Sequence, residues 1–174
     1  MKLGTLDWVP AAGRPDLLAP PVARAVETTA DEVAVAPIDP ALADTAAFCE
    51  RYGVTLEESA NCVIVAAKRG GETRYAAVMV LATMRADVNG VVRRHLDARK
   101  TSFAAQADAV ELTGMEYGGI TPLGLPDDWP VLVDAEVARR PLLVVGSGIR
   151  GSKLALAGAA LARLKTAEVL PLAA

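Results

Sequence analysis

The sequence predicts an α/β (α+β) fold in which short helices surround a mixed β-sheet. Strands and short helices alternate along the chain, but without the regular spacing of βαβ crossovers. Two continuous apolar runs bracket a Gly-Gly turn in the middle of the chain, which is typical of a buried β-hairpin. Hydrophobic residues make up 52% of the 174 residues, enough for a sizeable core, and this length fits one domain over residues 1–174.

The first 40 residues are expected to form an N-terminal extension that packs on the core. Residues 1–16 are rich in glycine and proline and predict a loop or a short strand. Residues 17–28 have apolar side chains at helical spacing. The apolar residues of 32–38 predict a strand that ends at Pro37.

A helix and then a hairpin are predicted in the central part of the chain. Residues 41–52 place apolar side chains on one helical face, and Gly53 follows as a terminator. The apolar runs 62–67 and 75–82 flank the Gly-Gly turn and predict two antiparallel strands. Because these runs are continuous rather than alternating, both faces of the hairpin are expected to be buried.

Shorter elements are predicted in the rest of the chain. Asp87 is expected to cap a helix that ends at Leu96, and Ser102 to cap a short helix that ends at Gly114. Residues 114–130, with four glycines and three prolines, predict a long loop. Two short strands, a further strand and a closing helix are expected over residues 131–133, 142–145, 153–156 and 157–164.

Composition argues against several classes of protein. Aromatic residues make up only 4% of the chain, too few for a platform that stacks single-stranded nucleic acid. The longest apolar run, 75–82, is far shorter than the ~20 residues of a membrane-spanning helix. Cys49 and Cys62 form neither a metal-ligand spacing nor a disulfide framework. The sequence therefore predicts a cytoplasmic protein with reduced thiols, no cofactor, no metal and no membrane association.

Charge is unevenly distributed, although the formal net charge is only -3. Residues 27–58 are acidic, with Arg51 as the single base. Basic residues gather in 85–100 and again in 150–165. A polyanion could contact the two basic segments if they share a face; the alternative is that both are solvated helix surfaces.

Two glycine-rich segments are the candidate functional loops. In residues 113–124, adjacent glycines followed by a proline allow the backbone to approach a ligand closely. Exposed amide N–H groups in such a turn can bind a carbonyl oxygen or an oxyanion. The second segment, 145–148, follows an apolar strand but lacks the spacing of a phosphate-binding P-loop. Both segments are also compatible with purely structural turns, and the only histidine, His95, has no partner motif.

At these two loops the sequence resembles the YbaK/EbsC family, relatives of the editing domain of bacterial prolyl-tRNA synthetases. The most specific segment is Glu111-Leu-Thr-Gly-Met-Glu-Tyr-Gly-Gly-Ile-Thr-Pro-Leu-Gly124, and the resemblance covers about residues 40–165. The shorter matching segments are 46–53, 59–65, 85–87, 131–134 and 145–148. The resemblance implies a barrel-like mixed sheet wrapped by helices and an aminoacyl-tRNA deacylase, which hydrolyses the ester of a mischarged tRNA.

The resemblance also implies the site residues. A catalytic centre is expected from the first loop and the residue that precedes the hairpin run: Asn61, Gly118, Gly119 and Pro122. Substrate-binding residues are expected in the same loop and the second turn: Ile120, Thr121, Ser147 and Gly148. The implied partner is the aminoacylated 3′ end of tRNA, with candidate contacts at Arg93, Arg94, Arg99 and Lys100. The oligomeric state stays open.

One position departs from the family. Its members usually carry a lysine just before the first apolar core strand, where this chain has Asn61. Asn61 is uncharged and shorter, but it could still bond a substrate hydroxyl. Lys68 would lie ~23 Å away along a straight strand and cannot replace that lysine, whereas Lys100 could approach from another segment.

Three hypotheses follow from the sequence. The first is a deacylase with a modified pocket, and the second is a non-catalytic module that binds aminoacyl-adenosine or a nucleotide-like ligand. Replacement of the family lysine by Asn61 favours the second. The third is a hydrolase or binding protein for an unrelated small molecule.

Overall fold

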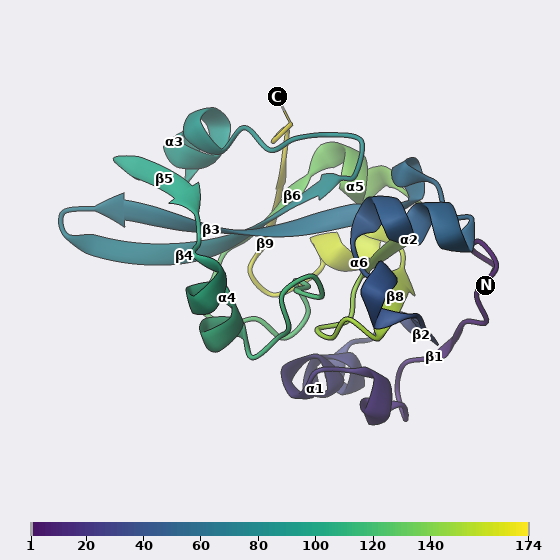
Figure 1. The fold of residues 1–174 in the computed structure, drawn as a ribbon. Helices are drawn as coiled ribbons and strands as arrows, with labels where there is room; N and C mark the ends of the chain where they lie inside the picture. The colour runs from purple at the N-terminus through teal and green to yellow at the C-terminus, as the bar shows by residue number, and fades with distance from the viewer. Residues whose placement is uncertain (1, 174) are drawn as a thin grey trace.

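The strands of the computed structural model, which describes residues 2–173, form two β-sheets (Figure 1). The first sheet has the order β1-β2-β8-β7 and is antiparallel: β1 (Val9–Pro10), β2 (Ala34–Pro37), β8 (Ser152–Leu156) and β7 (Leu143–Gly146). The second sheet has the order β5-β3-β4-β6-β9: β5 (Lys100–Phe103), β3 (Ala60–Arg69), β4 (Glu72–Leu81), β6 (Val131–Asp134) and β9 (Ala167–Leu170). It is mixed, because β6 pairs in parallel with both β4 and β9.

This arrangement confirms the predicted mixed α+β class. A bridge between Ser59 and Val144 joins the two sheets. Within residues 2–173 the sheets do not close on each other, so the expected barrel-like description overstates the closure.

Short helices surround the two sheets, and α1, α5 and α6 pack against the main apolar core (Figure 1). The α-helices are α1 (Pro20–Thr28), α2 (Thr45–Tyr52), α3 (Arg93–His95), α4 (Gln106–Thr113), α5 (Ala135–Arg139) and α6 (Gly158–Ala162). A π-helical turn, Val88–Val92, precedes α3, and 3-10 turns occupy Pro15–Leu17, Pro40–Leu42 and Leu56–Glu58. No helix of the described residues combines the length and the apolar character of a membrane span.

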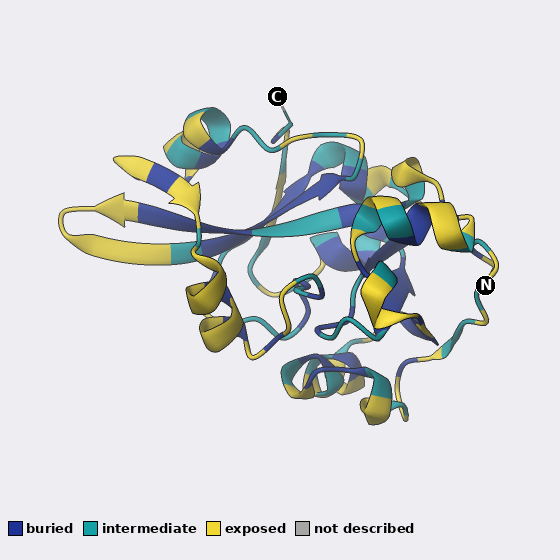
Figure 2. Cartoon of the chain, in the orientation of Figure 1, coloured by how far each residue is buried: buried dark blue, intermediate teal, exposed yellow. Residues whose placement is uncertain are grey.

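The β3–β4 hairpin is the longest element of the fold and is confirmed where the sequence predicts it. Its strands pair from Ala60↔Leu81 to Arg69↔Glu72. The two turn residues, Gly70 and Gly71, both have positive φ, as a two-residue hairpin turn requires. Burial on both faces is limited to the base of the hairpin, since the tip projects beyond the other strands and is exposed (Figure 2).

Local termination signals are also confirmed. Gly53 has φ 70° and ends α2 by donating its N–H to the Cys49 carbonyl. Asp87 accepts hydrogen bonds from the N–H groups of Gly90 and Val91, so it caps the π-helical turn at the predicted position.

The predicted cap at Ser102 is wrong. Ser102 lies in β5 and pairs with Ala66 of β3, and α4 begins at Gln106 without a side-chain cap. Pairing with the free edge of β3 satisfies the backbone of this segment, and this tertiary contact overrides the local capping signal. Strand β9 was not predicted because it is a short strand that is defined by its pairing with β6.

The main apolar core lies between the two sheets and includes Val35, Leu154, Met79 and Val133. A second cluster fills the space between the outer face of the second sheet and the π-helical turn. A third places Phe48 of α2 on the outer face of the first sheet. Alternation along β8 directs Lys153, like Ala155, toward this third cluster.

Candidate functional site

A cavity of about 420 Å³ lies between α2, the start of β3, the glycine-rich loop and the first sheet. Its walls comprise residues 43–45 with Phe48, residues 59–64, residues 117–118 with Ile120, and part of β7 and β8. Phe103, at the end of β5, lies at its edge with 66% of its surface exposed. The volume is within the range of small-molecule sites in proteins.

Asn61 contributes a polar group to this cavity. It is the second residue of β3, and its Oδ1 accepts a hydrogen bond of 2.8 Å from the hydroxyl of Thr45, the first residue of α2. Thr45 therefore orients the side-chain amide. Among the described residues the Asn61 NH₂ group makes no hydrogen bond, so it is available to donate to a ligand.

Lys153 is a candidate functional residue that the sequence analysis did not identify. Its side chain reaches the cavity from β8, it is only 7% exposed, and its Nζ donates a 2.8 Å hydrogen bond to the Ala43 carbonyl. Nζ also lies 5.3 Å from the centre of the Phe48 ring. Burial, with a smaller contribution from Arg150, lowers the pKa of Lys153 from 10.5 to about 8. The signal that could have found it is a lysine within an apolar strand, Lys153-Leu-Ala-Leu.

The two glycine-rich segments are bonded to each other. The Gly148 N–H donates to the Gly119 carbonyl at 2.7 Å, and the Glu116 N–H donates to the Gly148 carbonyl at 2.8 Å. Gly146 packs so closely on this loop that a Cβ there would lie 2.4 Å from the Gly119 oxygen. The first loop therefore packs directly on the end of β7, and this contact fixes the position of the loop in the cavity wall.

The predicted site residues divide into two groups. Asn61, Gly118 and Ile120 line the cavity. The other five are buried and are not among the residues that line it: Gly119, Thr121, Pro122, Ser147 and Gly148.

The five buried residues of the second group support the backbone of the glycine-rich segments. The Ser147 hydroxyl bonds to Ser152 and to the Ile149 carbonyl. Thr121 is fully buried, and its hydroxyl oxygen has no hydrogen-bond partner within residues 2–173. These residues hold the positions of the backbone segments that face the cavity.

Arg150 connects three parts of the site from outside. Its guanidinium donates to the carbonyls of Pro40 and Tyr117 and pairs with Asp44 at 3.4 Å, while its backbone N–H donates to the Glu116 carboxylate. The residues before α2, the first glycine loop and the β7–β8 turn are thereby tied together.

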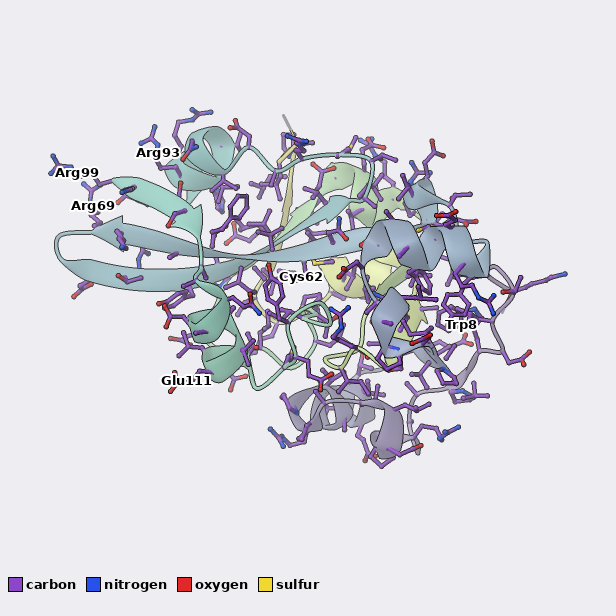
Figure 3. The ribbon with its side chains drawn as sticks, in the orientation of Figure 1. Trp8, Cys62, Arg69, Arg93, Arg99 and Glu111 are labelled. Atoms are coloured by element: carbon purple, nitrogen blue, oxygen red, sulfur yellow. The ribbon has the colours of Figure 1, made fainter. Side chains whose placement is uncertain are left out.

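Cys62 is the cavity thiol. Burial raises its pKa to about 12, so the thiol is protonated at neutral pH. A protonated thiol is a poor nucleophile, and Cys62 therefore contributes apolar surface rather than reactivity. Figure 3 places it in the middle of the molecule, to the left of α2 in this view.

The hairpin tip carries a concentration of positive charge. Lys68, Arg69, Arg99 and Lys100, here called the basic edge, line an open groove with the turn glycines. Lys68 and Lys100 are register partners across β3 and β5. Figure 3 shows Arg69 and Arg99 together at this end of the hairpin.

Two of the four predicted tRNA contacts, Arg99 and Lys100, belong to the basic edge. Arg93 and Arg94 lie nearby on α3, whose end contacts the hairpin through a hydrogen bond from Arg74 to the Leu96 carbonyl. The basic segment 150–165 lies elsewhere: Lys153 lines the cavity, Arg150 bonds to the lining residues Asp44 and Tyr117, and Arg163 pairs with Asp31.

Comparisons with known proteins found a matching family model and solved structures of similar fold. The family model of the aminoacyl-tRNA editing domain matches residues 39–164. A solved structure described as a candidate trans-editing enzyme for prolyl tRNA synthetase superposes with a TM-score of 0.74 at 20% identity, covering 90% of this chain and 99% of the other. A scaffold protein used for computational epitope grafting gives a TM-score of 0.76 at 19% identity, covering 90% and 97%. The structure of a hypothetical protein gives a TM-score of 0.68 at 22% identity, covering 79% of this chain and 86% of the other. At these sequence identities the three structures establish the fold alone.

Proposed function

This chain belongs to the family of aminoacyl-tRNA editing domains, and on that basis we propose that it is a cytoplasmic trans-editing deacylase that hydrolyses the ester of mischarged tRNA. The observation that carries the proposal is the cavity, whose walls include Asn61 together with Gly118 and Ile120 of the glycine loop. Its volume accommodates an aminoacyl group with its ribose.

In this proposal the attacking group is water. The ester of an aminoacyl-tRNA is already activated, so positioning supplies much of the rate. The protonated thiol of Cys62 is unsuited to attack. Asn61 donates to a substrate hydroxyl or carbonyl, and the backbone at Gly118 and Ile120 limits the size of the aminoacyl side chain.

The first test is release of amino acid from a panel of mischarged tRNAs by the wild type and by Asn61→Ala. We expect the wild type to deacylate at least one member of the panel. Asn61→Ala should lower kcat/KM by about tenfold, as loss of one hydrogen bond worth ~1.4 kcal/mol predicts. Asn89→Ala is the matched control, because Asn89 lies in the π-helical turn and outside the cavity lining.

The alternative is a non-catalytic module that binds aminoacyl-adenosine or a nucleotide-like ligand. The observation that favours it is Asn61 in place of the family lysine. It predicts thermal stabilisation by an aminoacyl-adenosine without release of amino acid from any tRNA in the panel. That combination of results would replace the deacylase with the binding module.

We further propose that the basic edge contacts the tRNA backbone. β3 runs from Asn61 at the cavity to Lys68 at the basic edge, a distance of roughly 23 Å for seven residues. The exposed ring of Phe103, which pairs with Val65 midway along β3, lies between the two. One tRNA therefore occupies the cavity and the basic edge at the same time, with its aminoacyl end in the cavity and its phosphates at the hairpin tip.

Salt dependence tests this contact. The double variant Arg99→Gln/Lys100→Gln should bind tRNA more weakly and reduce the slope of log affinity against log salt concentration by about two, one for each lost phosphate contact. Arg24→Gln, on the exposed face of α1, is the control and should leave the slope unchanged. An unchanged slope in the double variant would place the tRNA backbone elsewhere.

A further inference from the structure

Lys153 holds a positive charge in the cavity wall without a counterion. Its Nζ has one hydrogen bond, to the neutral carbonyl of Ala43, and forms no ion pair within residues 2–173. The nearest acidic neighbour, Asp44, is largely exposed and paired with Arg150. A buried cation is costly without compensation, and Lys153 is 7% exposed. The cavity beside it is where an electronegative group of a ligand would supply that compensation.

The surroundings of Lys153 contain few groups that could take its proton or balance its charge. From α2 and the residue before it, Cys49 and Asp44 face it; from the β7–β8 turn, Arg150 does. Burial is the main reason that the pKa of Lys153 falls to about 8, and Arg150 adds to it. At neutral pH the group is thus an ammonium that gives up its proton readily, as suits a general acid near its working pH.

Lys153 and Asn61 approach the same short segment from different sheets. Lys153 Nζ donates to the Ala43 carbonyl, while Asn61 is bonded to Thr45, two residues further on. Both side chains line the cavity. A ligand in the cavity therefore has both the ammonium and the Asn61 amide in the wall around it.

We propose that Lys153 is a catalytic residue of this cavity, whose ammonium binds the ribose oxygen of the aminoacyl ester and protonates it as the acyl bond breaks. The role rests on the proposed deacylase function. The oxygen of the attacking water bonds to the acyl carbon, and the bond from that carbon to the ribose oxygen breaks. The electron pair stays on the ribose oxygen, which takes the proton of Lys153. The attacking water releases a proton that restores the ammonium.

The test compares single-turnover deacylation by the wild type, Lys153→Met and the control Lys165→Met, an exposed lysine outside the cavity. Lys153→Met should be slower by about 100-fold or more, as loss of a general acid predicts. The ratio of wild-type to Lys153→Met rates should be constant below pH 7 and fall by about tenfold per pH unit above pH 8, because the wild-type lysine then loses its proton. In Lys153→Met, the affinity for an amide-linked aminoacyl-adenosine, which resists hydrolysis, should change much less than the rate of deacylation.

The outcomes separate the two proposals. An active wild type with an equally active Lys153→Met variant overturns the role of Lys153 and leaves the deacylase intact. A slow variant whose rate ratio does not change with pH, or whose affinity falls as much as its rate, reduces Lys153 to a binding contact and also overturns the proposal. A wild type that deacylates no tRNA in the panel overturns the deacylase and the role of Lys153 together.

Discussion

Lys153→Met is expected to be more stable than the wild type at pH 7, by roughly 1–3 kcal/mol. The wild type buries an ammonium whose pKa falls from 10.5 to about 8, a difference that corresponds to roughly 3 kcal/mol. Methionine fills a similar volume without charge. Part of this gain in stability is offset, because the Ala43 carbonyl loses its hydrogen-bond donor, which costs about 1 kcal/mol.

The stability difference should depend on pH in a defined direction. Below pH 8 the lysine is protonated in both the folded and the unfolded chain, so the penalty is fully present. Between pH 8 and pH 10.5 the unfolded chain binds more protons than the folded one, and the wild type gains stability as the pH rises. The advantage of Lys153→Met should therefore shrink over this range.

Urea unfolding at pH 7, 8, 9 and 10 measures this effect. Lys165→Met, at an exposed position, should differ from the wild type by less than about 0.5 kcal/mol at every pH. A Lys153→Met variant that is less stable than the wild type by the same amount throughout would mean that the ammonium is well compensated in the folded protein. A stabilised variant that no longer deacylates would identify Lys153 as a residue kept for function at the expense of stability.

Gly146→Ala should destabilise the protein by about 1–3 kcal/mol and disable the cavity, although it adds a single methyl group. The new Cβ would lie 2.4 Å from the Gly119 oxygen and 2.8 Å from the Ile120 oxygen, distances that Cβ atoms do not tolerate. Both contacts are backbone atoms of the first glycine loop, so a rotamer change cannot relieve them. The loop must move, and Gly118 and Ile120 move with it at the cavity wall.

Gly151→Ala is the matched control. It lies in the β7–β8 turn that follows Gly146, but its Cβ would meet its nearest neighbours, side-chain atoms of Ile149 and Pro40, at 3.8 Å. This variant should be neutral or slightly stabilised, because alanine restricts the unfolded chain. Chemical unfolding and affinity for an amide-linked aminoacyl-adenosine measure both variants. Wild-type stability and affinity in Gly146→Ala would show that the loop does not depend on its contact with β7.

Local signals in the sequence determined much of the fold. The Gly-Gly turn between apolar runs predicts the β3–β4 hairpin, and Gly53 and Gly114 end their helices with positive φ. These features depend on residues close together in the chain, because backbone sterics act over a few residues. The resemblance around residues 111–124 likewise indicated the loop that contributes Gly118 and Ile120 to the cavity.

The tertiary structure alone decided one feature of the fold and one feature of the site. Ser102 lies in a strand rather than capping a helix, because the edge of β3, more than thirty residues earlier, pairs with it. Lys153 lines the cavity because β8 pairs with β2 and β7 and turns that side chain toward α2. Its position next to Ala43 joins residues 110 apart in sequence, and such a contact follows from packing rather than from any local pattern. The sequence thus identified the loop of the candidate site, and the packing of the two sheets placed the Lys153 ammonium in its wall.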